Sequence, residues 1–421
     1  MKLLVLTDKY YPRPYANAAC AQELIRCWVA DGHVVDVLAY EDYDGMPSTW
    51  EENAVFYVKP DWRLRSYYYA DFFQNTRKGR LRRFFANIIS KSRGLILFPW
   101  QPFWSFSFPR RIYRKIEELH SNNHYDGIVA ILKPLDCNIA VCHFKKKHPQ
   151  IPYIVYCVDT MEKTILRPIF GGLYSDGFFW EKRLLSYSDA YFYMQPRIKT
   201  YEKKKFDPYR RKLVVADLPR FMAKDISSVS VFDFSHDGEN WVYAGSLGPP
   251  HYAADNVLEV FEIISTNKKR TLHLFARGED ADRLAKIARE RKISVVVHGY
   301  VNTDTLLSVM SSADVIVSIK TSCQISAKIF ECMSYGKTIV HFSGVDCDPD
   351  VEYYKKYPLC FVFKMYDDYC SQLESLLEFL DQNVGKRVDI ASLEEIFMMN
   401  TPEYSANKIV DKIKNLVKNA P

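Results

Sequence analysis

The chain has 421 residues, of which 48% are hydrophobic and 26% charged, and a formal net charge of +6. This composition excludes a disordered or collagen-like chain, and the length predicts two folded domains. Ten cysteines without a Cys-x-x-Cys pair predict reduced thiols, and no metal site is visible. The N-terminal apolar run is too short for a signal peptide, and no run approaches the ~20 apolar residues of a spanning helix. We therefore expect a cytoplasmic protein, either soluble or peripheral on the inner face of the cell membrane.

Apolar strands alternate with helical patterns in the first half of the chain. The pattern predicts strands over 3–6, 34–38, 127–131 and 153–158, with a helix over about 18–31. Such alternation is typical of an α/β domain with a parallel sheet and helices on both faces.

A basic and aromatic segment interrupts this alternation. Residues 77–93 read R-K-G-R-L-R-R-F-F-A-N-I-I-S-K-S-R, and an aromatic run containing Trp100 and Trp104 continues to Arg111. Basic residues interleaved with aromatic ones suit an anionic membrane surface. The alternative is a basic solvated helix followed by a loop whose aromatic side chains fill the core. Nucleic acid is not expected as a partner, because no recognised binding module accompanies the segment.

The second half repeats the alternation of strands and helices. It predicts strands over 240–244, 272–275, 294–298 and 315–319, and helices over 255–264, 280–289 and 303–310. A polar stretch over 221–239 marks the boundary, so the predicted domains are 1–220 and 221–400. Residues 401–421 carry a last helix, with a proline at its first position and apolar residues on one face. The first domain is one candidate for its packing partner.

The segment S-A-K-I-F-E-C-M-S-Y-G-K, Ser326 to Lys337, follows the last of these strands. Free main-chain N–H groups at a helix start, together with Lys328, would face phosphates, and Glu331 would accept hydrogen bonds from ribose hydroxyls. The alternative is an ordinary core-facing helix that ends at Gly336.

The order of these segments resembles the GT-B glycosyltransferases, and within them the large retaining group, family 4-like, that builds bacterial polysaccharides and glycolipids. The resemblance implies two doubly wound Rossmann-like domains that face a cleft. It rests on Y-A-G-S-L-G, F-A-R-G, H-G-Y-V and S-A-K-I-F-E, in that order. The donor-binding residues that it implies are Gly245, Ser246, Leu247, Gly248, Arg277, Gly278, Gly299, Tyr300, Val301, Ser326, Ala327, Lys328, Ile329 and Glu331.

Two stretches depart from the pattern of that family. Many members carry a second acidic residue eight positions before the glutamate, where this chain has Cys323. Basic residues that often follow the first glycine loop are also missing, because Ser246 and Pro249–Pro250 stand there. These departures leave the donor open and keep a non-catalytic partner subunit as an alternative.

The resemblance also implies site residues in the first domain. Tyr11, Asn17 and Ala18 belong to a loop and helix start that close over the reaction centre, unless that loop only anchors tyrosines in the core. Asp159 follows the strand over 153–158 and would stabilise the sugar or orient the acceptor hydroxyl. A helix cap is its alternative role.

These inferences predict a hexosyltransferase of the retaining type. It would transfer a sugar from a nucleotide-diphosphate donor to a saccharide or lipid-linked acceptor in capsule, O-antigen or exopolysaccharide synthesis. The resemblance supplies no metal-binding triplet, so we expect neither metal nor cofactor. A nucleotide-sugar epimerase on the same fold is a further alternative.

Overall fold

The computed structural model describes most of the chain. The described residues are 1–11, 16–43, 45–51, 53–62, 64–66, 76–96, 107–158, 177–224, 226–227, 229–234, 237–248, 254–276 and 279–419. The chain divides into two compact units. The first unit comprises Met1–Pro219 and Pro402–Pro421, and the second comprises Arg220–Thr401.

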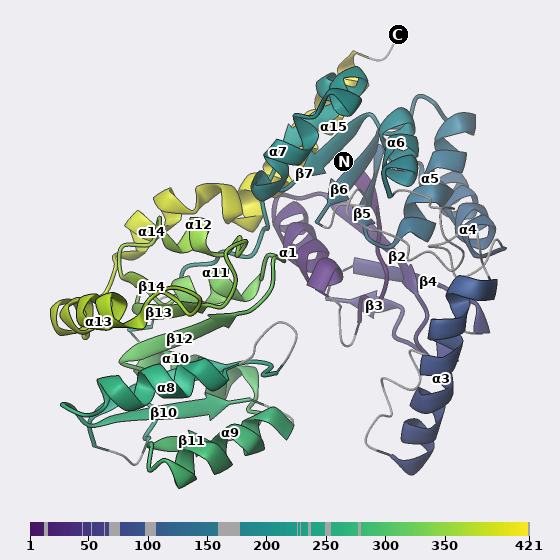
Figure 1. The fold of residues 1–421 in the computed structure, drawn as a ribbon. Helices are drawn as coiled ribbons and strands as arrows, with labels where there is room; N and C mark the ends of the chain where they lie inside the picture. Colours follow the sequence, from purple (N-terminus) through teal and green to yellow (C-terminus); the bar gives the residue numbers. More distant parts are fainter. Residues whose placement is uncertain are drawn as a thin grey trace. The chain divides into compact units, whose positions relative to one another are not determined.

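The first unit is built on an eight-stranded sheet (Figure 1). Its strand order is β3-β4-β2-β1-β5-β6-β7-β8, and every neighbouring pair is parallel except β3 with β4. The strands are β1 (Lys2–Leu6), β2 (Val34–Tyr40), β3 (Thr49–Trp50), β4 (Asn53–Val58), β5 (Gly127–Leu132), β6 (Tyr153–Cys157), β7 (Ala190–Tyr193) and β8 (Leu213–Val215). The central strands are continuous apolar runs with both faces buried, as parallel sheets require.

Helices cover both faces of this sheet. The helices of the first unit are α1 (Ala16–Ala30), α3 (Arg77–Ile96), α4 (Ser107–Asn123), α5 (Leu135–Lys147), α6 (Gly177–Tyr187), α7 (Ile198–Tyr201) and α15 (Pro402–Lys418), with short 3-10 turns at Gln195–Arg197 and Lys204–Lys212. All of them except α3 lie against the sheet (Figure 1). Side chains of α4, α5 and α6 form one buried cluster with alternate residues of the strands, Leu4 and Leu6 among them. The parallel sheet and the strand positions predicted from the periodicity are confirmed.

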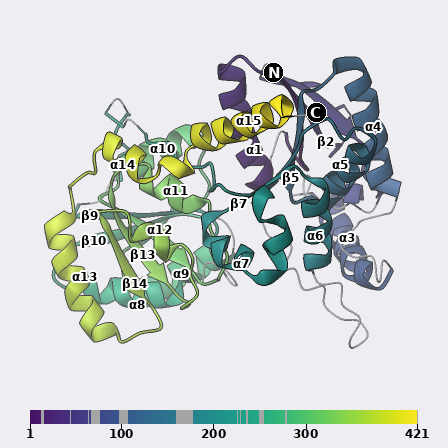
Figure 2. The same cartoon turned by 90° about the horizontal axis from the view of Figure 1, so that it is seen from above.

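The C-terminal helix α15 belongs to this first unit. It packs beside α1 (Figure 2), and the indole N–H of Trp28 donates to the Ala406 carbonyl at 3.0 Å. The fully buried Ile413 side chain reaches the first residue of β5, where a Cβ added to Gly127 would lie 3.1 Å from Ile413. The last helix therefore completes a core that begins almost 400 residues earlier in the chain.

The second unit is built on a six-stranded parallel sheet of order β11-β10-β9-β12-β13-β14. Its strands are β9 (Glu239–Ala244), β10 (Arg270–Phe275), β11 (Val295–Val297), β12 (Val315–Lys320), β13 (Thr338–Ser343) and β14 (Cys360–Lys364). Its helices are α8 (Asp255–Ile264), α9 (Glu279–Glu290), α10 (Thr303–Ser312), α11 (Lys328–Met333), α12 (Val351–Tyr354), α13 (Tyr369–Asn383) and α14 (Ile390–Ile396). The helix predicted over 255–264 has the same bounds, and the other elements agree within two residues.

The polar stretch predicted as a boundary is part of the second unit. Its first residue, Phe221, is fully buried and contacts the ring of Phe397, with 5.1 Å between the ring centroids. The main-chain N–H of Phe221 also donates to the Asn400 carbonyl at 2.9 Å. The few aromatic residues of this stretch therefore decide its packing, although its average composition is polar.

Helix α3 extends away from the sheet of the first unit (Figure 1). Leu81, Phe84, Phe85 and Ile88 are 48–60% exposed, and their spacing places them on one helical face.

Over the described ranges, no helix is long and apolar enough to cross a membrane.

We predict that α15 is needed for the stability of the first unit. Ile413→Ala should lower the free energy of unfolding by roughly 2–5 kcal/mol, because it opens a cavity against β5. Val417→Ala on the same helix removes a side chain that is 49% exposed and should change it by less than about 0.5 kcal/mol. Urea unfolding of both variants measures the difference, and equal effects would contradict this packing role.

Candidate functional site

A cavity of about 360 Å³ opens at the carboxyl edge of the second sheet. It lies where the strand order reverses between β9 and β12, the position at which open α/β sheets bind ligands. Its lining residues come from five loops and helices: Ala244, Gly245, Ser246, Phe275, Tyr300, Val301, Leu306, Met310, Lys328, Glu331 and Cys332. The structure therefore brings together residues of all four motifs identified from the sequence.

Lys328 is held in a slot at one wall of this cavity. Its ammonium lies 3.8 Å from the centroid of the Tyr243 ring, which stabilises the cation through the negative face of the ring. On the other side, a Cβ added to Gly245 would lie 2.5 Å from the ammonium nitrogen. Gly245 also has a φ of +138°, which L side chains rarely adopt. A side chain at position 245 would therefore disturb both the loop and the lysine.

Burial lowers the pKa of Lys328 from its ordinary 10.5 to about 8, against the opposing effect of Cys332 and Glu331. An anion that binds beside a poorly solvated ammonium group interacts with it more strongly than with an exposed one, because water screens the two charges less. The ammonium is thus suited to an anionic ligand in the cavity.

Glu331 lines the same wall, one helical turn after Lys328. Lys224 lies near it, and the Glu331 carboxylate favours the charged form of this lysine, although burial lowers the pKa of Lys224 overall. The Lys224 ammonium donates to the Tyr335 hydroxyl at 3.0 Å and lies 4.5 Å from that ring centroid. The second unit thus supplies Glu331 with a basic neighbour that the motif analysis did not identify.

The start of α11 differs from the prediction that its amide groups are free. The Lys328 N–H donates to the Ser326 hydroxyl oxygen at 3.3 Å, and the Ile329 N–H donates to the Ser326 carbonyl at 3.3 Å. Ala327 takes the N-cap position without a side-chain bond, and Ile329 is buried in the core. Ser326 therefore supports the helix start, and two of the amide groups there are already bonded.

The glycine loop has two parts with different roles. Gly245 and Ser246 line the cavity, and the Tyr243 hydroxyl donates to the Ser246 carbonyl. Leu247 packs against the hydrophobic core, and Gly248, with a φ of +114°, lies against the Asp280 carboxylate at the start of α9. The second part therefore anchors the loop.

The remaining wall is apolar. Phe275, Leu306 and Met310 face the cavity together with Val301, whereas Tyr300 is 69% exposed at its edge. The His298 ring stacks on the Phe275 ring, with 4.3 Å between the two ring centroids. Gly299 precedes Tyr300 with a φ of +74° and allows the turn. Leu306 and Met310 belong to none of the motifs. Their only sequence signal is a spacing of four residues, which places both side chains on one face of a helix.

The predicted site residues are placed only in part. Asp159 of the first unit and Arg277 and Gly278 of the second lie outside the described residues. Asn17 lies in the first turn of α1, and its side-chain amide donates to the Lys133 carbonyl at 3.4 Å. Ala18 is buried and Tyr11 is half-buried, next to a fully buried Tyr10.

The strand order of the first sheet also reverses, between β1 and β5, and charged residues gather at that carboxyl edge. Lys9 and Asp42 form an ion pair at 3.2 Å with both side chains 1% exposed. Burial raises the pKa of the neighbouring Asp8 to about 7. The motif analysis did not identify these residues, because Asp8 and Lys9 have no characteristic spacing.

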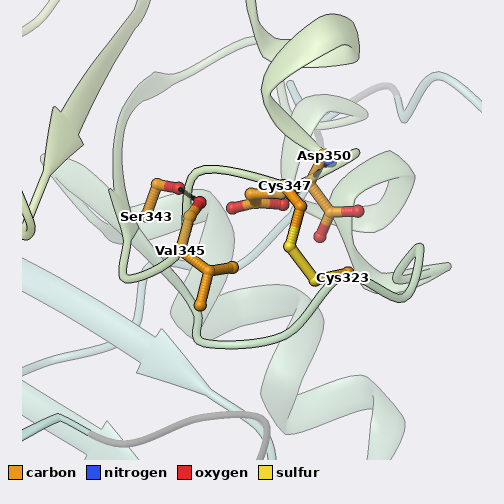
Figure 3. The surroundings of a disulfide bond; sticks show 6 residues. Cys323, Ser343, Val345, Cys347 and Asp350 are labelled. Carbon is orange, nitrogen blue, oxygen red and sulfur yellow. Dashed lines mark hydrogen bonds between the residues drawn. A yellow bond between two sulfur atoms is a disulfide. The ribbon is translucent and has the colours of Figure 1, made fainter.

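Two cysteines depart from the expected reduced state. Cys323 and Cys347 form a disulfide across two loops of the second unit (Figure 3). The prediction of reduced thiols throughout was wrong for this pair, because the folding of two neighbouring strands brings together cysteines 24 residues apart. The other eight cysteines form no disulfide. Within the described ranges, no group of three His, Cys, Asp or Glu side chains could hold a metal ion.

Residues 238–353 match the family model of glycosyl transferases group 1. This range contains every residue that lines the cavity. The matched range lies within the second unit. Among curated protein sequences, none matches the chain.

Solved structures with the same fold align with the whole chain. A sucrose-phosphate synthase from Thermosynechococcus elongatus aligns over 100% of both chains, with a TM-score of 0.63 and 10% identity. The lipopolysaccharide outer core galactosyltransferase WaaB, in its apo form, aligns over 99% of both chains, with a TM-score of 0.58 and 11% identity. A UDP-GlcNAc 2-epimerase from Methanocaldococcus jannaschii aligns over 99% of this chain and 100% of its own, with a TM-score of 0.55 and 10% identity.

The predicted GT-B fold is confirmed by these alignments. Together with the family match over residues 238–353, this fold supports a GT-B glycosyltransferase, as the motifs predicted. Because an epimerase shares the fold, the assignment to the transferases depends on the family match and not on the fold alone.

We predict that the buried charge of Lys328 costs stability. Lys328→Met should raise the free energy of unfolding at pH 7, because the neutral side chain removes the cost of burying a charge. The folded pKa lies below the ordinary value, so this cost is complete below pH 8 and disappears as the pH rises towards 10.5. The advantage of the variant should therefore shrink between pH 7 and pH 10.

The control is Lys364→Met, which changes an exposed lysine of the same unit. The difference in the free energy of unfolding between Lys364→Met and the wild type should not depend on pH between pH 7 and pH 10. Urea unfolding at pH 7, 8.5 and 10 measures both differences. An advantage of Lys328→Met that stays constant or grows with pH would contradict the burial of this charge.

Proposed function

We propose that the cavity binds a nucleoside-diphosphate sugar and that the enzyme transfers its sugar to a saccharide or lipid-linked acceptor. The observation that carries this proposal is the pair Lys328 and Glu331 on one wall of a cavity at the carboxyl edge of the sheet. The ammonium suits the diphosphate, the carboxylate suits the ribose hydroxyls, and the apolar wall at Phe275 and Met310 suits the base.

The charges of the reaction agree with this arrangement. When the bond between the anomeric carbon and the diphosphate oxygen breaks, negative charge develops on the leaving phosphate and positive charge on the sugar. Lys328 would stabilise the leaving phosphate in a poorly solvated site, where electrostatic interactions are stronger than in water. No step of this scheme requires a metal ion. Asp159 remains our prediction for the residue that faces the sugar or the acceptor hydroxyl.

We place the reaction in the synthesis of a cell-envelope polysaccharide, such as capsule, O-antigen or exopolysaccharide, with a hexose transferred with retention of configuration. The motif resemblance supports this placement. One of the structural neighbours is itself a lipopolysaccharide galactosyltransferase, which is consistent with it. The surface of α3 supports a lipid-linked acceptor, because that acceptor would require the enzyme to reach a membrane.

Helix α3 combines an apolar stripe with positive charge. Residues 77–93 contain seven Lys or Arg residues and no acidic residue. The exposed Leu81, Phe84, Phe85 and Ile88 form the stripe, and the exposed Arg80 lies beside it. A helix of this kind binds anionic lipid through both its charge and its apolar area. We propose that it places the enzyme on the inner face of the cell membrane.

Three assays separate the transferase from its alternatives. The transferase releases nucleoside diphosphate from a nucleotide sugar when an acceptor is present. An epimerase instead interconverts two nucleotide sugars without releasing the nucleotide. A non-catalytic partner subunit binds nucleotide and does neither, so binding combined with a silent panel of nucleotide sugars and acceptors would contradict the proposed transfer.

We predict that Glu331→Gln weakens nucleotide binding while the fold stays intact. A thermal-shift screen with uridine, guanosine and cytidine diphosphates first identifies the ligand, because binding to the folded state raises the unfolding midpoint. Calorimetry should then show a loss of about tenfold to a hundredfold in affinity, because the ribose loses a charged acceptor. Glu352→Gln, at an exposed glutamate on α12, is the matched control. Unchanged affinity in a folded Glu331→Gln protein would remove Glu331 from the site.

We predict that charge reversal on α3 releases the protein from anionic vesicles. Each basic residue near the surface contributes about 1 kcal/mol, so replacing Arg80, Arg82, Arg83 and Lys91 by glutamate should lower partitioning by at least roughly a thousandfold. Phe84→Ser with Phe85→Ser should also weaken binding, and this effect should not depend on salt.

The matched control reverses four charges elsewhere on the first unit, at Lys203, Lys204, Arg210 and Arg211, which are exposed. Co-sedimentation with vesicles of anionic phospholipid, at low and high salt, measures the binding of the wild type and of all three variants. Equal release by the control variant would show that net charge, and not α3, causes binding. A wild-type protein that stays in the supernatant at low salt would contradict the membrane proposal.

A further inference from the structure

The Cys323–Cys347 disulfide joins the loops that follow two neighbouring strands (Figure 3). Cys323 lies between β12 and α11, shortly before Lys328, and Cys347 lies between β13 and α12. Their Cα atoms are 5.1 Å apart. Because β12 and β13 are parallel, both loops leave the sheet at the carboxyl edge that also carries the cavity.

Two main-chain hydrogen bonds reinforce this connection. The Ser326 N–H donates to the Asp350 carboxylate at 3.0 Å, and the Gly344 N–H donates to the Lys320 carbonyl at 2.7 Å. The loop over 321–327 is thus attached to the loop over 344–350 at Cys323 and Ser326, and the last residue of β12, Lys320, is bonded to Gly344.

A buried polar network fixes the loop over 344–350 to the sheet. The His341 ring bonds Asp348 at 2.9 Å through Nε2 and the Ser318 hydroxyl at 3.1 Å through Nδ1. The Asp350 N–H donates to the Asp348 carboxylate at 2.9 Å. His341 and Asp348 are fully buried, so breaking these bonds would leave polar groups without water or a partner. This loop is therefore a firm support for the disulfide.

Helix α11, which carries Lys328 and Glu331, depends on such a support. It has six residues, and its N-cap residue makes no side-chain hydrogen bond. A helix of this length is not stable in isolation, so its attachments decide where its side chains lie. The disulfide is the covalent attachment nearest to its start.

Both bridged cysteines are exposed, whereas five of the eight cysteines outside the disulfide are buried and only Cys370 of the eight is exposed. A soluble thiol can therefore reach this disulfide directly. Thiolate attack on one sulfur forms a mixed disulfide, and a second thiol of the reductant resolves it. Two electrons and two protons pass to the protein, which gains two cysteine thiols, and the dithiol reductant becomes a disulfide.

We propose that the Cys323–Cys347 disulfide is a redox-sensitive clamp that positions α11 for donor binding. With the disulfide formed, Lys328 and Glu331 are held ready for the ligand. After reduction, the loop over 321–327 keeps only its hydrogen bonds, and donor binding has to order it again. This inference rests on the proposed function, because it assigns a regulation to the same site.

The test is calorimetric titration of the whole protein with uridine, guanosine and cytidine diphosphates, before and after reduction with dithiothreitol. We expect the affinity for the bound nucleotide to fall about five- to tenfold on reduction, since ordering a loop at a binding site opposes association. The double variant Cys323→Ser with Cys347→Ser should bind as weakly as the reduced protein, whether or not dithiothreitol is present. Cys370→Ser should respond to reduction like the wild type.

The outcomes distinguish this inference from the proposed function. Equal affinity in the oxidised and reduced wild-type protein would overturn the clamp and leave the donor site intact. Ten free thiols in the denatured, unreduced protein, where the clamp requires eight, would also overturn it. Folded protein that binds no nucleoside diphosphate in either state would instead contradict the donor site itself. In activity assays, the clamp predicts that reduction raises the donor KM and leaves kcat unchanged.

Discussion

The reversal of strand order between β9 and β12 is the constraint on which the second unit depends. The connections that follow the strands on the two sides of this point run toward opposite edges of the sheet. The loops after β9 and β12 therefore separate and leave a crevice. Gly245, Phe275 and Lys328 follow or end three of these strands and therefore meet there. The first sheet reverses in the same way between β1 and β5, where the buried charges of its carboxyl edge gather.

Within that crevice, the position of one ammonium group links the loops to each other. Lys328 fits between the Tyr243 ring and the main chain of Gly245, and the same tyrosine holds the glycine loop through Ser246. The glycine loop, β9 and α11 are therefore joined through the contact between the Lys328 ammonium and the Tyr243 ring. A site built in this way is organised before its ligand arrives, which lowers the cost of binding.

The sequence predicts the parts of this arrangement that depend on local periodicity. Strands, the helix over 255–264, and the spacing of Lys328 and Glu331 all follow from residues close in the chain. Contacts between distant segments could not be predicted in the same way. Met310 reaches the cavity from a helix without a motif, and Cys323 meets Cys347 only because two strands pair in parallel. The role of Ser326 could not be predicted either, because a hydroxyl at a helix start can bond either a ligand or the helix itself.

The most direct test of this account is a crystal structure of the protein with the nucleoside diphosphate that binds it. We expect the diphosphate beside the Lys328 ammonium, at a hydrogen-bond distance of about 2.7–3.2 Å, with the ribose hydroxyls at Glu331 and the base against Phe275. A nucleotide bound away from this cavity, or one whose phosphates do not contact Lys328, would contradict it.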